Sequence, residues 1–276
     1  MATLQRNALA GISETSRRQL TKLHRNTSGL LDVDEAAALL GLDGVRAAKL
    51  LAHWSSQGWV RCLRRGLYLL IPLEATSPDD WSADPWVIAE RLFKPGYVAG
   101  WSACEHWGFT EQIFRDVAVF TAAPIRQRKL LVDQTTFALR KIPKRMLFGL
   151  HPVWRTHVKV SVSDPTRTII DILDDPRWGG GVRHVAQILD AYVSSEHRNE
   201  TLLLDYVERR GNAAVAKRLG FLWEIIVGRK EDQSFLNQLL KFVGPGYALL
   251  DPAVAPRGPF LSKWNLRANV DVARHD

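Results

Sequence analysis

Three aspartates near the end of one expected helix have the spacing best suited to chemistry on nucleic acid. Asp171, Asp174 and Asp175 follow an apolar helical segment, and residues three or four apart lie on one side of a helix. Carboxylates placed in this way could hold a divalent cation for hydrolysis. Carboxylates at a helix end are more often solvated, so we expect neither a catalytic nor a metal site here.

Other catalytic and cofactor motifs are missing from the sequence. No G-x-S-x-G, G-x-x-x-x-G-K-[ST] or G-x-G-x-x-G pattern occurs, and the glycines 179–181 lack the strand and lysine of a phosphate loop. Cys104, Glu105 and His106 are adjacent, so a helix cannot turn all three toward one ion. Two cysteines are too few for a disulfide scaffold or a four-cysteine zinc site. We therefore expect no cofactor.

Length, hydrophobicity and charge exclude further classes. The chain has 276 residues, of which 46% are hydrophobic, and a formal net charge of +8. Its longest apolar stretch, Leu67–Leu73, includes Pro72 and falls far short of the roughly 20 residues that cross a membrane. No apolar secretory segment lies near the N-terminus, so we expect a cytoplasmic protein without a membrane partner. The basic balance favours polyanionic partners.

One stretch of the sequence is basic and free of acids. Gly44–Leu73 contains five basic residues and neither Asp nor Glu. On a helix over residues 44–57, one side would be apolar, formed by Ala47, Ala48, Leu51 and Trp54. The opposite side would carry Arg46, Lys49, His53, Ser56 and Gln57. Arg61 and the pair Arg64–Arg65 follow in an expected hairpin. The candidates for contacts with DNA are therefore Arg46, Lys49, His53, Gln57, Arg61, Arg64 and Arg65.

The elements around that stretch predict a winged helix-turn-helix. We expect helices over 15–25, 32–40 and 44–57, with Gly41 ending the second and Asp43 capping the third. A hairpin over 59–71 would turn at Arg64-Arg65-Gly66. Such a domain places its last helix in the major groove and its hairpin against phosphates or the minor groove. Exposed lysines and arginines can also simply solvate a surface, which is the alternative.

A segment rich in Ser, Pro and Asp, residues 74–85, is interpreted as a linker. We therefore expect a DNA-binding domain over 1–75 and a larger mixed α+β domain over 76–276. In the second domain, strands are expected over 116–121, 137–142, 157–162 and 260–272. Helices are expected over 85–93, 102–107, 182–195, 201–210, 213–227 and 234–243, with another that begins after Asp164. A second basic region, 125–145, could contact RNA, a DNA backbone or an acidic partner, or form a solvated surface.

Motifs along nearly the whole chain resemble those of the AbiEi antitoxins. The expected winged helix ends in the family-like Arg65-Gly66-Leu67-Tyr68. Four later segments resemble family motifs in family order: 97–110, 163–171, 210–224 and 264–269. Trp101 and Trp107 depart from the pattern, because small or aliphatic residues are expected there.

The resemblance implies an antitoxin of a type IV toxin–antitoxin system. The winged helix would bind inverted repeats in its own promoter and repress transcription, and a dimer on DNA is possible. The C-terminal domain would counter a nucleotidyltransferase-like toxin, and a stable complex with it is not required. The signature residues carried over are Asp164, Arg167, Asp171, Arg218 and Glu224.

Each signature residue also has a structural interpretation. Asp164 would be an N-cap, and Arg167 and Asp171 would form an i,i+4 pair on a surface. Arg218 and Glu224 would tie a late helix to its neighbours. Two other functions stay open: a transcription factor whose C-terminal domain senses a ligand or dimerises, and a nuclease or toxin-modifying enzyme centred near Asp171.

Overall fold

The computed structural model describes residues 11–72, 75, 81–228 and 232–272. These residues form two compact units. The first consists of the chain up to residue 91 together with residues 131–136 and 154–159, and the second of 92–130, 137–153 and the chain from 160 onward. The predicted boundary between residues 75 and 76 borders residues outside the described ranges and stays a prediction.

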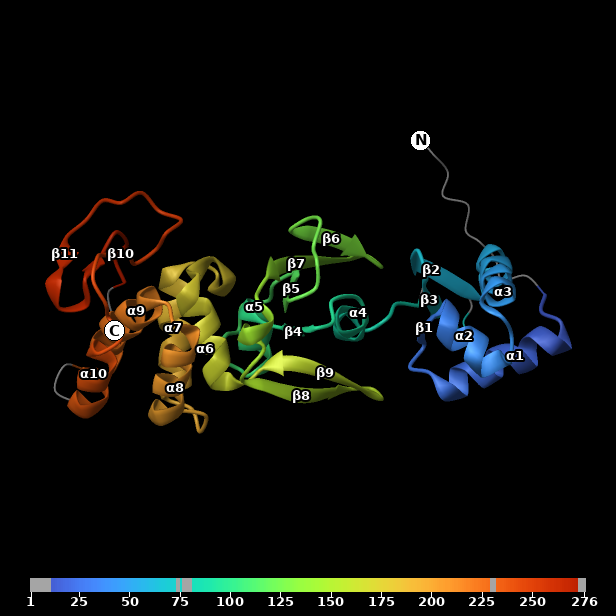
Figure 1. Cartoon of the computed structure of the whole chain (residues 1–276), viewed down its shortest axis with the longest axis horizontal. Coiled ribbons are helices and arrows are strands. Elements are labelled where there is room, and N and C mark those ends of the chain that lie inside the picture. Colours follow the sequence, from blue (N-terminus) through green and yellow to red (C-terminus); the bar gives the residue numbers. More distant parts are fainter. Residues whose placement is uncertain (1–10, 73–74, 76–80, 229–231, 273–276) are drawn as a thin grey trace. The chain divides into compact units, whose positions relative to one another are not determined.

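The first unit begins with three helices and a three-stranded sheet (Figure 1). Its elements are α1 (Glu14–Asn26), β1 (Leu30–Asp32), α2 (Val33–Leu40), α3 (Gly44–Ser56), β2 (Val60–Arg64) and β3 (Leu67–Leu70). The strands are antiparallel in the order β1-β3-β2, with Leu30 opposite Leu69. The three predicted helices and the hairpin are confirmed. Sequence analysis missed β1, which is too short to show a periodic pattern.

Local sequence signals set the helix ends in this unit. The Asp32 side chain accepts a hydrogen bond from the backbone N–H of Glu35, and the Glu35 side chain accepts one from the backbone N–H of Asp32. Gly41 ends α2 in the left-handed region, with φ of 69°. Two residues later, the Asp43 side chain accepts a hydrogen bond from the backbone of Arg46 and starts α3. This close succession of stop and start signals produces the short turn between α2 and α3.

A mixed six-stranded sheet has the strand order β6-β7-β5-β4-β9-β8. Its strands are β4 (Gly96–Val98), β5 (Val117–Thr121), β6 (Lys129–Val132), β7 (Thr135–Lys141), β8 (Leu150–Arg155) and β9 (Val158–Ser163). The strands β5 and β7 run parallel, as do β4 and β9, whereas β4 and β5 are antiparallel. Two helices accompany the early strands, α4 (Pro85–Leu92) and α5 (Gly100–His106).

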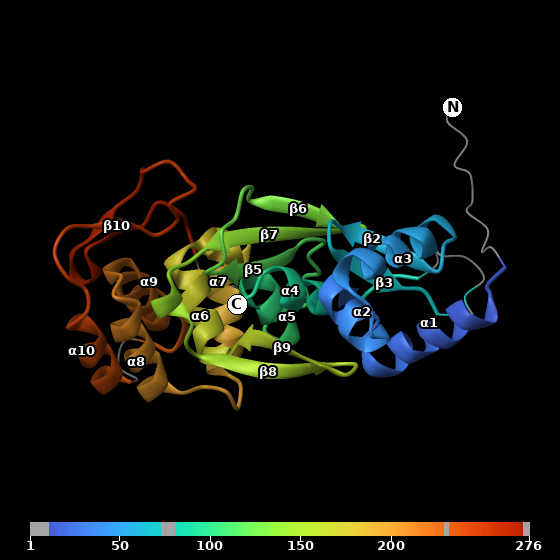
Figure 2. The ribbon, with the colours of Figure 1, turned by 45° about the vertical axis from the view of Figure 1, so that its right-hand side comes forward.

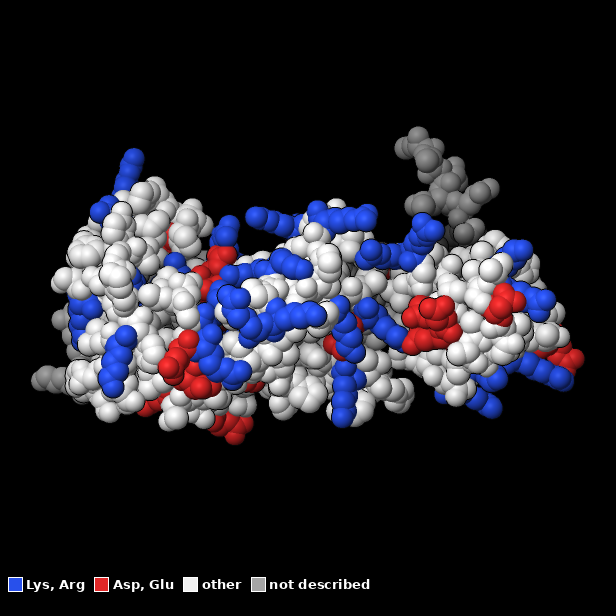
Figure 3. Space-filling view, viewed as in Figure 1, with Lys and Arg blue, Asp and Glu red and all other residues white. Residues whose placement is uncertain are grey.

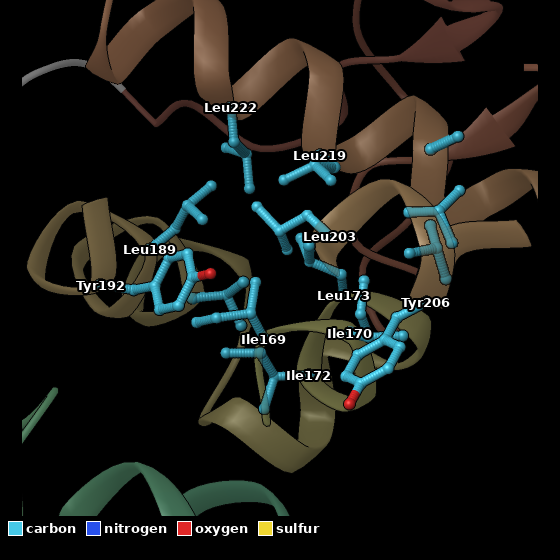
Figure 4. Packing of buried hydrophobic residues seen from close by; sticks show 14 of the residues in the cluster. Ile169, Ile170, Ile172, Leu173, Leu189, Tyr192, Leu203, Tyr206, Leu219 and Leu222 are labelled. Carbon is cyan, nitrogen blue, oxygen red and sulfur yellow. The ribbon is translucent and has the colours of Figure 1, made fainter. Parts of the chain in front are cut away.

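The second unit continues with α6 (Pro165–Asp174), α7 (Val182–Val193), α8 (Glu200–Arg210), α9 (Ala213–Ile226) and α10 (Gln233–Leu240). In Figures 1 and 2, α6 lies between the sheet and the helices α8 and α9. Every residue of α6 from Thr166 to Asp174 is buried. Figure 4 shows Ile169, Ile170 and Leu173 of this helix packed among side chains from α7, α8 and α9. The hydrophobic core of this unit is therefore built around α6.

The fold class is mixed α+β, with ten α-helices among the described residues. The prediction of one long strand over Phe260–Val272 is wrong. This segment forms two short strands, β11 (Phe260–Leu261) and β12 (Leu266–Arg267), separated by a 3₁₀ turn, η4 (Ser262–Trp264). Asn265 has a φ of 46°, which reverses the chain and breaks the strand. The strand β12 also pairs with β10 (Ala248–Leu249).

A close contact between α9 and η4 yields a stability prediction. A Cβ atom added to Gly220 would lie 2.1 Å from the ring of Trp264, which is fully buried and cannot move aside. Gly220→Ala should therefore lower the free energy of unfolding by about 1–3 kcal/mol, although alanine favours a helix by about 1 kcal/mol. Gly44→Ala at the start of α3, where nothing lies within 4 Å, is the control and should not destabilise. Denaturant unfolding measures both, and an unchanged midpoint for Gly220→Ala would refute the contact.

Candidate DNA-binding surface and buried signature residues

The helix α3 separates its apolar and basic residues cleanly. Ala47, Leu51 and Trp54 have no exposed surface, whereas Arg46, Lys49 and His53 are exposed. The buried side of the projected helix is thus confirmed for these three residues. Arg46 pairs with Asp43 at 3.2 Å, but both side chains are mostly exposed. Surface pairs of this kind contribute little, so the guanidinium of Arg46 is available to another partner.

The hairpin presents two more cations at its tip. Arg64 and Arg65 are exposed, and the chain turns between β2 and β3 at Gly66, whose φ is 86°. The register of the two strands shifts between Cys62 and Arg64, so the tip is an irregular bulge. Gln57, the remaining candidate near α3, is the half-buried C-cap of that helix.

Arg61 differs from the other candidate DNA-binding residues. Its Nη2 lies 2.5 Å from Oδ1 of Asp133 and also donates to the carbonyl oxygen of Trp81. Asp133 accepts a second hydrogen bond from the backbone of Ala83. The predicted DNA contact of Arg61 stays a prediction, but its guanidinium already has protein partners within the first unit.

The first signature residue, Asp164, is the predicted N-cap of α6. Its Oδ1 accepts a hydrogen bond from the backbone N–H of Arg167 at 2.7 Å. Its Oδ2 accepts another from the hydroxyl of Tyr206, at 2.7 Å. Asp164 therefore starts α6 and also ties it to α8.

The prediction that Arg167 and Asp171 form a surface pair is wrong. The two groups are 2.9 Å apart, and their side chains are only 1% and 2% exposed. The hydroxyl of Tyr97 donates to Asp171 and accepts from Arg167. Burial raises the pKa of Asp171, which the adjacent guanidinium of Arg167 opposes. The sequence shows the i,i+4 spacing correctly, but the helix carrying it is covered by the sheet and by other helices.

The acidic cluster is divided among different partners. Asp174 accepts hydrogen bonds from Arg140, Arg210 and Asn212. Burial alone would raise its pKa, but the charges of Arg140 and Arg210 hold the pKa below its usual value. Asp175 binds the guanidinium of Arg177 through both carboxylate oxygens. No set of three or more potential metal ligands comes together among the described residues.

The last two signature residues tie α9 to its neighbours, as predicted. Arg218 donates to the carbonyl oxygens of Leu173 and Asp174 at the end of α6, at 2.7 and 3.0 Å. It also reaches the carbonyl oxygens of residues 249 and 250. Glu224 accepts from Nε1 of Trp264 at 2.9 Å and pairs with Lys263. Both side chains hold the C-terminal segment against the helices.

The sequence analysis did not predict the buried partners of these residues. Tyr97, Arg140 and Asn212 come from distant segments, and no periodic pattern links them to α6. One signal was present: Asp164, Arg167, Asp171 and Asp174 follow one stripe of a helix with apolar residues on both sides. Polar residues in so apolar a helix can indicate buried pairs as well as a solvated surface.

Comparisons with known proteins agree with the fold class and give no family. No family model matches the chain, and no curated protein does. The fold is similar to the crystal structure of the RV2827C protein from Mycobacterium tuberculosis, with a TM-score of 0.64. The match covers 95% of this chain and 94% of that one, at 17% identity. Within the described residues, no helix has the length and hydrophobicity to span a membrane.

The contacts of Asp174 predict a pH-dependent loss of stability. Because Arg140 and Arg210 lower its pKa in the folded chain, the ionised carboxylate stabilises the fold above the unfolded pKa of about 4 and stops doing so as pH falls through the folded value. Asp174→Asn should lower the free energy of unfolding by about 3 kcal/mol at pH 7. The gap between variant and wild type should shrink below about pH 4.

The matched control is Asp205→Asn, which removes an aspartate from a half-exposed i,i+4 pair with Arg209. It should change the free energy of unfolding by less than about 0.5 kcal/mol. Urea unfolding of both variants between pH 3 and pH 7 makes the measurement. A deficit for Asp174→Asn that stays constant over this range would contradict the pairing.

Proposed function

We propose that this protein is a DNA-binding antitoxin of an AbiE-like system that represses its own promoter and has no catalytic activity. The observation that carries the DNA-binding half is the exposed basic row of Arg46, Lys49 and His53 on α3. A helix buried along one side and basic along the other suits the negatively charged surface of a nucleic acid.

In this proposal, the N-terminal elements are a winged helix-turn-helix. The helices α2 and α3 with the turn at Gly41 form the helix-turn-helix, and the hairpin of β2 and β3 forms the wing. Arg46 and Lys49 lie in the first turns of α3, the part of a recognition helix that reaches base edges. Arg64 and Arg65 would contact phosphates or the minor groove.

Repression would follow from occupancy of inverted repeats in the promoter. Two copies of the chain on the two arms would double the contacts and exclude polymerase. Because cations on α3 and the wing would replace counterions on the phosphates, binding should weaken steeply as salt rises. The site of action would be the cytoplasm.

The antitoxin half of the proposal rests on the motifs of the second unit. The signature residues Asp164, Arg167, Asp171, Arg218 and Glu224 hold α6 and α9 in place, so they would act as a scaffold. The surface that counters a nucleotidyltransferase-like toxin would then consist of exposed residues around it. Antagonism without a stable complex is compatible with this arrangement.

The two other candidate functions give different experimental outcomes. A nuclease or toxin-modifying enzyme centred near Asp171 would cleave nucleic acid or change the mass of the toxin, with or without Mg²⁺. The geometry argues against that centre, because Asp171 and Asp174 are occupied by arginines. A regulator with a ligand-sensing or dimerising C-terminal domain would repress its promoter and rescue no cells from a toxin.

The recognition helix gives the first functional prediction. Arg46→Ala combined with Lys49→Ala should weaken operator binding by about 10-fold or more, because two contacts to bases or phosphates are lost. Arg64→Ala should weaken binding to operator and unrelated duplex alike and reduce its salt dependence. Gel shifts at several fixed salt concentrations measure all three effects.

The control is Lys241→Ala with Arg257→Ala, which removes two exposed cations of the second unit. This variant should bind operator as the wild type does. Wild-type affinity in the Arg46 and Lys49 variant would refute the assignment of α3 as the recognition helix.

The two proposed activities should also separate in cells. The full chain with Arg46→Ala and Lys49→Ala should still rescue cells from a nucleotidyltransferase-like toxin encoded beside it, while a reporter under its promoter becomes derepressed. The physical reason is that both substituted side chains are exposed on α3, so their removal should leave the chain folded. Loss of rescue at unchanged protein level would contradict the division of roles.

A further inference from the structure

A groove in the second unit combines cations with tryptophans. Its volume is about 500 Å³. Arg128 and Lys129 line it from the start of β6, Lys141 from the end of β7, and Arg177 from the 3₁₀ turn η3 (Pro176–Gly179). Trp101 of α5 and Trp178 of η3 also line the groove. Figure 3 shows lysines and arginines gathered over β5, β6 and β7.

The cations of this groove are positioned and largely exposed. Lys129 lies 2.7 Å from Asp116, yet its side chain is 71% exposed. Arg177 is held by Asp175 with 63% of its side chain exposed. Lys141 donates to the carbonyl oxygen of Ala122, at 2.8 Å. Among the described residues, no carboxylate pairs with Arg128 or Lys141, so the groove keeps excess positive charge for an anion.

The tryptophans belong to an ordered stack of three rings. Trp101 stacks on Phe114 on one side and on Trp178 on the other, with ring centroids 5.3 and 5.2 Å apart. Nε1 of Trp101 donates to the carbonyl oxygen of Asp116, which fixes the ring. Both tryptophans are half-exposed. Aromatic rings beside cations are the combination that binds a base together with its phosphate.

We propose that this groove binds a nucleoside phosphate, either as a free nucleotide or as one unit of a single strand. Because both faces of Trp101 are covered by Phe114 and Trp178, the base would lie against the exposed parts of the two tryptophan rings that line the groove. The phosphates would contact Arg128, Lys141 and Arg177. The volume suits a ligand of nucleotide size, and a concave groove of this size does not admit a duplex. An acidic peptide would use the cations without needing the rings. This site goes beyond the proposed antitoxin activity and does not depend on it.

The test measures binding of fluorescent probes to the full chain by anisotropy at one fixed salt concentration. The probes are labelled ATP, labelled GTP, a labelled single-stranded decanucleotide and a labelled operator duplex. Arg128→Ala combined with Lys141→Ala should weaken binding of nucleotide or single strand by about tenfold, because two charge-assisted contacts are lost. Binding of the operator should not change. Both residues are exposed, so an unchanged melting temperature is expected.

Lys241→Ala with Arg257→Ala removes the same charge away from the groove and should bind every probe as the wild type does. Competition tests whether the tryptophans contribute to binding. ATP should displace the probe about tenfold better than tripolyphosphate, which lacks a base. Saturable binding of free nucleotides identifies a nucleotide site, and binding of the oligonucleotide alone identifies a single-strand site. Both outcomes support the proposal.

Three results would overturn it. The first is the absence of binding by both nucleotides and the single strand at millimolar concentration. The second is wild-type affinity in the Arg128 and Lys141 variant. The third is displacement of the probe by tripolyphosphate or polyglutamate as effectively as by ATP. Operator binding, measured in the same samples, tests the DNA-binding proposal separately.

Discussion

The second unit depends on the complete burial of α6. A helix in an apolar core can keep polar side chains only if each finds a partner, because an unpaired buried charge costs several kcal/mol. Asp171 is met by Arg167 and Tyr97, and Asp174 by arginines from β7 and α8. Arg218 then satisfies the last carbonyl oxygens of the helix. The strands and helices around α6 thus supply the partners that its buried polar groups require.

This arrangement changes how a motif centred on α6 is interpreted. A segment of aspartates and arginine resembles an active site in sequence, but here the same charges neutralise one another inside the core. Burial raises the pKa of Asp171, while paired arginines lower that of Asp174. Opposite shifts in neighbouring carboxyls can indicate an acid and a base. Because both groups are covered by protein, burial accounts for the pKa shift of Asp171 and structural pairing with arginines for that of Asp174.

The sequence predicted elements well where local signals decide them. The caps at Asp43 and Asp164 and the stop at Gly41 were predicted directly, because each acts within one helical turn. Burial of α6 could not be read in this way, because the residues that cover it are distant in sequence. The engagement of Arg61 by Asp133 has the same cause. Short strands such as β1 and β10 were also missed, since they form only by pairing with β3 and β12.

The net charge of +8 therefore indicates partners only after the cations that stabilise the fold are separated from those that remain exposed. Arg140, Arg167 and Arg210 hold buried or half-buried carboxylates, and Arg218 holds backbone carbonyls. These cations stabilise the fold and are not available to bind a ligand. Among the cations that remain exposed, two groups differ in character. The group on α3 and at the hairpin tip contains no tryptophan, which suits contact with a regular duplex. Those in the groove lie beside stacked rings, as suits an unpaired base.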